Sequence, residues 1–249
     1  MFLYEQTTKL LMKKRVAQKK ETIVISLGGS LICPKEVDIK FLKTIITLIK
    51  KQQKGKRIII ITGGGYFCRK YITAFGKVCI KKKSTQFKDN VGISLTRANA
   101  TLVQQLLIAS GIKAMPAQIG NPAKRINWKN YNVAVGAGYL PGHSTDYDAV
   151  LAAIANDAKT VINLTNIDYV YTKDPKKYKN AKPLKNLMWK DYKKVLKIKK
   201  WSAGLHTPFD PFASALAEKK KLSVIIVNGK KKKNLKSALG KTPIGTRIS

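Results

Sequence analysis

The sequence predicts an α/β fold built on a mainly parallel sheet. Two observations favour it: the β-branched runs at residues 22–27 and 57–61 each end in a glycine-rich turn, and a segment of helical periodicity follows each turn. An unbroken apolar run is typical of a strand buried on both faces. The repeated order of strand, turn and helix therefore predicts neighbouring parallel strands, with ligands at their carboxyl ends.

The remaining segments continue this alternation. A helix is expected over residues 38–53, where Asp38 supplies an N-cap and apolar residues recur at helical spacing. The stretch from Asp168 to Pro183 is polar and rich in turn residues, which predicts a long loop or a β-hairpin. Further helices are expected over residues 67–75, 89–110, 149–158, 212–219 and 234–239, and further strands over 132–135, 160–164, 222–227 and 244–248.

Domain organisation follows from composition. No Pro/Ser-rich linker interrupts the pattern, so we expect one folded unit over residues 22–249 and a basic extension over residues 1–21. With 44% apolar residues among 249, the chain has enough material for a substantial core. No secretion signal and no run of about 18 apolar residues is visible, which favours a cytoplasmic protein with no membrane partner.

The charge is strongly positive, with 49 basic against 13 acidic residues and a net charge of +36. Such a field attracts polyanions, including nucleotides and nucleic acids. The lysines are spread along the chain and accompany no RNA-binding signature, so a solvated surface is favoured over a nucleic-acid interface. Three separated cysteines and two histidines offer no metal-ligand spacing.

Glycine-rich turns are the candidate ligand-binding elements of the chain. They occur at Gly28-Gly29-Ser30, at Gly63-Gly64-Gly65 and over residues 136–145, each after a predicted strand. Glycine lets backbone amides approach a phosphate without obstruction by a Cβ atom. No GxxxxGK[ST], spaced GxGxxG or GxSxG sequence occurs, which disfavours P-loop NTPases, dinucleotide dehydrogenases and serine hydrolases.

The order of motifs over residues 22–249 resembles the archaeal-type UMP kinases of the amino-acid kinase superfamily. The matching motifs are Leu27-Gly28-Gly29-Ser30, Thr62-Gly63-Gly64-Gly65 with Arg69-Lys70-Tyr71, Phe87-Lys88-Asp89 with Gly92 and Thr96-Arg97-Ala98-Asn99-Ala100, Pro141-Gly142-His143-Ser144-Thr145-Asp146, Thr165-Asn166-Ile167-Asp168, Val170-Tyr171-Thr172-Lys173-Asp174-Pro175 and Asp210-Pro211. The resemblance implies a three-layer αβα sandwich of the carbamate kinase-like type and a homohexamer. It also implies that UMP binds over the N-terminal half and ATP over the C-terminal half.

The resemblance also implies the site residues. ATP would be bound by Gly29, Ser30, Gly65, Arg69, Thr165, Asn166, Tyr171 and Asp174. UMP would be bound by Gly64, Asp89, Gly138, Tyr139, Leu140, Pro141, Gly142, His143, Ser144 and Thr145. Arg69, Thr145 and Asp146 would take part in catalysis, with Arg69 as the principal protein cation. Mg²⁺ would bind through the ATP phosphates, and no protein ligand to the metal is expected.

Four of these residues have a structural alternative. Asp89 either accepts from the ribose hydroxyls or caps a helix, and Asp146 either orients the reacting groups or caps the helix that follows. His143 either contacts the nucleotide or stabilises its own loop. Tyr171 either binds adenine or is an ordinary half-buried strand aromatic.

Three positions depart from the wider superfamily. Lysines are expected where the chain has Ser26 and Ala215, and a glycine where it has Tyr169. The missing lysines leave open a nucleotide-binding or RNA-associated regulator with weakened catalysis, and an oligomeric storage protein is a more distant alternative. Acetylglutamate kinase, aspartokinase and isopentenyl phosphate kinase share the glycine turns, but Arg69 and Asp89 favour UMP.

Overall fold

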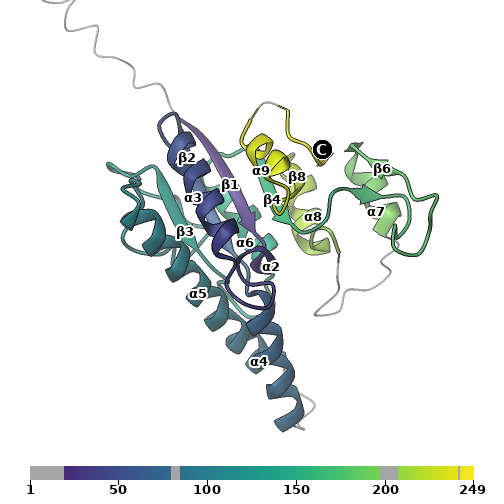
Figure 1. Ribbon diagram of the computed structural model, residues 1–249, viewed down its shortest axis with the longest axis horizontal. Coiled ribbons are helices and arrows are strands. Elements are labelled where there is room, and N and C mark those ends of the chain that lie inside the picture. The colour runs from purple at the N-terminus through teal and green to yellow at the C-terminus, as the bar shows by residue number, and fades with distance from the viewer. Residues whose placement is uncertain (1–19, 80–84, 197–206, 241) are drawn as a thin grey trace, which may run out of the picture.

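The computed structural model describes residues 20–79, 85–196, 207–240 and 242–249 (Figure 1). A seven-stranded sheet has the order β3-β2-β1-β4-β8-β9-β7. Strands β3, β2, β1, β4 and β8 are parallel, β9 runs antiparallel to β8, and β7 is parallel to β9. The carboxyl ends of the five parallel strands therefore meet at one edge. The strands are β1 (Glu21–Leu27), β2 (Lys56–Thr62), β3 (Val133–Gly136), β4 (Thr160–Thr165), β7 (Asn186–Leu187), β8 (Ser223–Asn228) and β9 (Thr246–Ile248).

Helices cover both faces of this sheet (Figure 1). Apolar residues of α2 (Gly29–Ile32), α3 (Ile39–Gln52), α5 (Thr85–Ala109) and α9 (Lys232–Ala238) form one core with one face of the strands. Those of α6 (Thr145–Ala155), α7 (Trp189–Leu196) and α8 (Pro211–Lys219) form a second core with the opposite face. The three-layer αβα sandwich expected from the resemblance is confirmed.

Alternation along the strands explains the two cores. Ile23, Ile25 and Leu27 of β1 belong to the first core, whereas Val24 between them belongs to the second. Successive side chains of a strand point to opposite faces, so a continuous apolar run fills both layers. The next residue after Val24 on the face towards α6 is Ser26, which is polar, buried and close to the carboxyl end of the strand.

Most predicted elements are confirmed, with shifted ends. The helix expected from residue 89 already includes Thr85, and the one expected over 149–158 covers Thr145–Ala155. Of the long loop and the β-hairpin that were both expected after β4, the structure has a hairpin, in which β5 (Val170–Tyr171) pairs antiparallel with β6 (Pro183–Leu184). The sequence analysis missed α2, β7 and α7. Of the basic extension, only Lys20 and Glu21 lie within the described residues.

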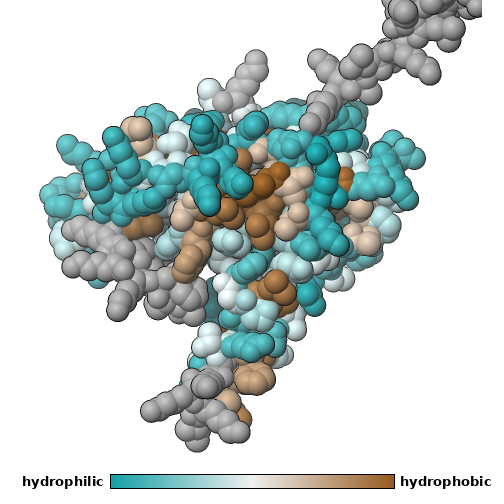
Figure 2. All heavy atoms as spheres, turned by 180° about the vertical axis from the view of Figure 1, so that it is seen from behind, coloured by the Kyte–Doolittle hydropathy of each residue, from teal (hydrophilic) through white to brown (hydrophobic). Residues whose placement is uncertain are grey.

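One helix pair extends beyond the sheet. Helix α4 (Gly65–Val78) packs on α5, and the two run out from the body of the molecule together (Figure 1). Phe67, Tyr71 and Val78 of α4 are exposed, and Val78 keeps 84% of its surface. Figure 2 shows a largely hydrophilic surface that surrounds a limited hydrophobic patch on the opposite side of the molecule. None of the described helices combines the length and hydrophobicity that a bilayer span requires.

Candidate active site

The turns after β1 and β2 are in contact at the carboxyl edge of the sheet. A Cβ atom on Gly29 would lie 2.1 Å from the Gly65 nitrogen, and one on Gly65 would lie 2.5 Å from the Gly29 oxygen. Gly65 also has a φ of 73°, which L side chains rarely adopt. Both positions therefore require glycine, and the contact brings the start of α2 beside the start of α4. We call this pair of turns the glycine cradle.

The glycine cradle suits a phosphate. Helix α4 begins at Gly65 with no side-chain cap. The Tyr66 amide donates to the Cys33 oxygen at 2.9 Å, so an anion would be bound by the other amides of this turn and by the helix dipole. Gly64 is packed so closely on Cys68 that a Cβ there would lie 2.4 Å from the cysteine Cβ. Asn99 of α5 holds the turn in place, because its Nδ2 donates to the carbonyl oxygens of Gly63 at 2.7 Å and Gly64 at 3.1 Å.

The loop between β3 and α6, residues 137–144, is fixed by three side-chain acceptors. Thr96 Oγ1 accepts from the Gly138 amide at 3.0 Å, and Asp148 Oδ2 accepts from the Tyr139 amide at 2.9 Å. The third acceptor is Asp89 Oδ2, which binds the Gly142 amide at 2.8 Å. We call residues 137–144 the acceptor loop, because it carries most of the residues expected to bind UMP.

Asp89 does not cap a helix. It is the fifth residue of α5, inside the helix, and its side chain reaches across to the Gly142 amide of the acceptor loop. The helix-cap alternative was therefore wrong. The carboxylate is an acceptor with a second oxygen, which remains available for a ribose hydroxyl as the resemblance implies.

His143 has a role inside the acceptor loop. Its Nδ1 lies 3.2 Å from Asp148 Oδ1, and its ring is 4.6 Å from that of Tyr147. Asp148 is completely buried, and this burial raises the pKa of its carboxyl to about 6, although hydrogen bonds from the Tyr139 amide and His143 oppose the shift. The loop-stabilising alternative for His143 is thus supported, and its Nε2 is left for a ligand.

Ser144 caps α6, and Asp146 does not. The Tyr147 amide donates to Ser144 Oγ at 3.1 Å, so the helix-cap alternative for Asp146 was wrong. Asp146 instead accepts from Ser26 Oγ at 2.7 Å and from the Asp210 amide at 3.2 Å. Burial raises the pKa of the Asp146 carboxyl to about 6, against the effect of both hydrogen bonds.

Asp146 joins three elements at the centre of the edge. It belongs to the first turn of α6, Ser26 lies near the end of β1, and Asp210 caps α8 by accepting from the Ala213 amide at 2.7 Å. Among the described residues, no lysine or arginine forms an ion pair with Asp146. Ser26 stands where the wider superfamily is expected to have a lysine. The Asp146 carboxyl is therefore paired with a hydroxyl group and not with an ammonium group.

A cavity of about 790 Å³ lies beyond the carboxyl end of β4, beside the β5–β6 hairpin. Tyr169 and Tyr171 both line it, with their ring centroids 6.3 Å apart in an edge-to-face arrangement. Asp168, also in the lining, is bound by Lys231 Nζ at 2.8 Å and by Asn228 Nδ2 at 3.1 Å. A cavity of this size, which combines two tyrosines with polar and charged side chains, fits a nucleoside. We call it the donor cavity.

The expected ATP residues divide between the cradle and the donor cavity. Asn166, Tyr171 and Asp174 line the cavity, while Thr165 ends β4 and accepts from the Gly229 amide through its carbonyl. The Asp174 carboxylate accepts from the Lys176 amide at 2.9 Å, which stabilises its own turn. Arg69 is exposed one helical turn after Gly65.

The described residues fit Mg²⁺ that arrives with a nucleotide. They contain no group of three or more His, Cys, Asp or Glu side chains that could hold a metal ion. The glycine cradle offers backbone amides to phosphates, and Mg²⁺ is commonly bound through phosphate oxygens and water.

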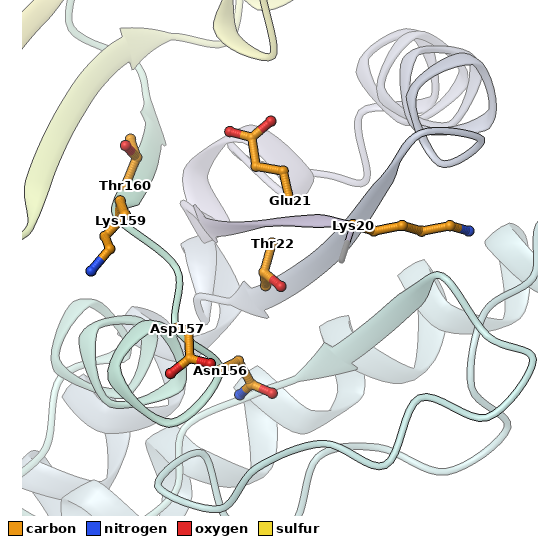
Figure 3. Close-up of a pocket in the computed structure, with 7 residues that line it drawn as sticks. All are labelled: Lys20, Glu21, Thr22, Asn156, Asp157, Lys159 and Thr160. Atoms are coloured by element: carbon orange, nitrogen blue, oxygen red, sulfur yellow. The ribbon is translucent and has the colours of Figure 1, made fainter. Parts of the chain in front are cut away.

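A hollow of about 410 Å³ lies at the opposite edge of the sheet, where β1 and β4 begin (Figure 3). Its lining mixes basic, acidic and amide side chains, and Figure 3 shows those of Lys20 and Glu21 pointing in different directions. Side chains that do not converge provide no common binding point. The carboxyl edge is therefore the candidate active site.

Comparison with known proteins identifies the family. Residues 21–228 match the model of the Amino acid kinase family. The chain belongs to the amino acid kinase family. Within this family, the uridylate kinase of Methanococcus aeolicus is 33% identical over 231 residues, covering 91% of this chain and 99% of the relative. That of Thermoplasma volcanium is 33% identical over 229 residues, covering 92% and 97%.

Solved structures of amino acid kinases agree with the fold. The crystal structure of the uridylate kinase from Archaeoglobus fulgidus has a TM-score of 0.78 and 27% identity, and covers 91% of this chain and 99% of that one. The UMP kinase from Ureaplasma parvum has a TM-score of 0.75 at 19% identity, over 93% and 100% of the two chains. The latter similarity supports the fold alone.

Sequence reasoning missed several residues that shape this site. Asn99 stood in a matched motif without a role, and Asp148 and Ser26 were not expected to position anything. Asn99 could have been found from its place in the motif. Ser26 carries no local signal, because its partner Asp146 lies 120 positions away. The partners of Asp148 lie five and nine positions before it, in a loop whose path the sequence pattern does not give.

Proposed function

We propose that this amino acid kinase is a UMP kinase, which transfers the γ-phosphate of ATP to UMP and releases ADP and UDP. The observation that carries the proposal is the arrangement along one sheet edge, where the glycine cradle lies between the acceptor loop and the donor cavity. The uridylate kinases that match nearly the whole chain support the same activity.

The two nucleotides bind to different parts of the site. ATP is placed with its base and ribose in the donor cavity against Tyr171, and with its phosphates on the amides of Gly29, Ser30 and Gly65. UMP is placed against the acceptor loop, with its ribose on Asp89 and its phosphate near Thr145. This division into an N-terminal acceptor half and a C-terminal donor half rests on the family resemblance.

In the reaction, an oxygen of the UMP phosphate attacks the γ-phosphorus of ATP, and the bond to the oxygen of the β-phosphate breaks. Such transfers depend on positioning and charge neutralisation more than on covalent chemistry by the protein. Mg²⁺, when bound with ATP, neutralises charge on the phosphates. The cradle amides orient the donor phosphates, Arg69 supplies a protein cation, and Asp146 fixes β1, α6 and α8 around the reacting groups.

Assembly and location are part of the proposal. The homohexamer implied by the resemblance would bury apolar surface, and the exposed Phe67, Tyr71 and Val78 of α4 suit such burial. Light scattering coupled to gel filtration measures the oligomeric state directly. A cytoplasmic location fits a biosynthetic enzyme that uses ATP.

A coupled assay of ADP release tests the function. It uses Mg²⁺-ATP and, as acceptors, UMP, CMP, AMP, acetylglutamate, aspartate and isopentenyl phosphate. We expect turnover with UMP far above that with every other acceptor. The absence of turnover with all acceptors, together with measurable nucleotide binding, would favour the regulator that the missing lysines at Ser26 and Ala215 suggested.

That regulator would differ in its response to salt. Affinity for RNA falls steeply with salt, because binding releases counterions from several phosphates. A mononucleotide in an enclosed site is much less sensitive. Binding of UMP and of a single-stranded RNA at two salt concentrations therefore separates the two functions.

A further inference from the structure

Asp148 closes the acceptor loop from inside the second core. Its two carboxylate oxygens bind different parts of the loop: Oδ2 accepts from the Tyr139 amide at 2.9 Å and Oδ1 contacts His143 Nδ1 at 3.2 Å. The side chain has 0% exposure. One buried carboxylate thus spans the turn Leu140–Gly142, which lies between its two partners.

The fold of α6 does not explain this carboxylate. The helix is already capped by Ser144, and its neighbours Ala149, Val150 and Ala152 are fully or almost fully buried apolar residues of the core. A buried carboxylate is usually destabilising relative to an apolar residue of similar volume. Its presence is better explained by the loop that it binds than by the helix that carries it.

The pair with Asp148 also orients the His143 ring. With Nδ1 directed at the carboxylate, Nε2 is the one polar atom of the ring left for another partner. The ring borders a hollow of about 200 Å³ that Gly142, Ser144 and Asp210 also line. Since the Asp210 amide binds Asp146, this hollow extends from the acceptor loop to the centre of the site.

We propose that Asp148 is a positioning residue for the acceptor nucleotide, which shapes residues 139–143 and holds His143 so that its Nε2 faces the bound nucleoside monophosphate. This inference rests on the proposed function. Asp148 acts through His143 and the loop backbone and does not touch the substrate. Donor binding depends on other elements, so the effect is confined to the acceptor.

The test compares Asp148→Asn and Asp148→Ala with the parent enzyme, and with Asp191→Asn as a control on an exposed carboxylate that pairs with Lys194 at 3.5 Å. Asparagine keeps the size of the side chain and an acceptor for the Tyr139 amide. We expect both Asp148 variants to raise the KM for UMP at least about fivefold while the KM for ATP changes less than about twofold, the pattern of lost acceptor binding alone. Asp191→Asn should leave both constants unchanged.

A double-mutant cycle with His143→Gln adds a readout that a purely structural role would not move. Because Asp148→Asn keeps an acceptor for the Tyr139 amide, its remaining effect should pass through His143. The combination of Asp148→Asn with His143→Gln should therefore have the same KM for UMP as His143→Gln alone within about twofold, because neighbours in one network are not additive. Additive effects, equal losses in both KM values, or an unchanged KM for UMP in Asp148→Asn would overturn the inference. If the parent enzyme itself shows no turnover with UMP, that result contradicts the proposed function before any variant is measured.

Discussion

Replacement of Asp146 by asparagine should stabilise the protein while it impairs turnover. The Asp146 carboxyl is held among Ser26, Asp210 and the start of α6, and burial raises its pKa from 3.8 to about 6. Raising the pKa by this amount costs the ionised form about 3 kcal/mol, at 1.36 kcal/mol for each factor of ten. Asp146 is only half-buried by its exposed surface, and screening by solvent reduces the expected stabilisation to about 2 kcal/mol.

The size of this stabilisation depends on pH. The pKa is higher in the folded protein than in the unfolded chain, so the folded state binds more protons between about pH 4 and pH 6. The contribution of Asp146 to stability is therefore complete below pH 4 and is lost as the pH rises through 6. Asp148 shifts in the same direction but is present in both proteins, so it cancels in the comparison.

Urea unfolding at pH 4.5 and pH 7.5 measures the difference. We expect Asp146→Asn to exceed the parent by less than about 1 kcal/mol at pH 4.5 and by about 2 kcal/mol at pH 7.5, because asparagine retains one donor and one acceptor for the two partners. Its kcat should fall at least about tenfold. A variant that is no more stable at pH 7.5, or a difference that does not change with pH, would refute the reasoning.

Three further substitutions test separate parts of the site. Asp89→Asn keeps an acceptor for the Gly142 amide but loses the charge, so it should raise the KM for UMP and leave that for ATP; an unchanged KM for UMP would remove Asp89 from the acceptor site. Arg69→Ala should lower kcat at least about tenfold, roughly 1.4 kcal/mol of transition-state stabilisation, and a parental kcat would exclude Arg69 as the principal cation. Tyr192→Phe should lower the free energy of unfolding by about 2 kcal/mol, because the hydroxyl both donates to the Phe209 oxygen and accepts from its amide in the core. Thermal and urea unfolding measure this loss, and parental stability would contradict it.

Local pattern was enough to predict most of the fold. The apolar runs of β1 and β2 and the glycines after them determine strands that are buried on both faces, and Asp38 caps α3 as expected by accepting from the Phe41 amide at 2.8 Å. The missed elements have weak local signals. Helix α7 is short and lysine-rich, and its stability comes from Trp189 and Tyr192, which pack into a core that residues far along the chain complete.

The site was predictable where a motif is continuous in sequence. The glycine cradle, the acceptor loop and the lining of the donor cavity all come from such motifs. The polar partners were not predictable, since Ser26 meets Asp146 across 120 positions and Tyr192 meets Phe209 across 17. The alternatives for Asp89 and Asp146 failed for the same reason, because each side chain binds a distant segment and not its own helix end.

The central claim is that this edge of the sheet carries phosphate from ATP to UMP. The most direct measurement incubates the chain with Mg²⁺ and ATP labelled at the γ-phosphate, in the presence of UMP, and identifies the labelled product by chromatography. The account predicts label in UDP, with none in UDP when Mg²⁺ is chelated. Label that stays in ATP, or appears only as inorganic phosphate, would contradict it.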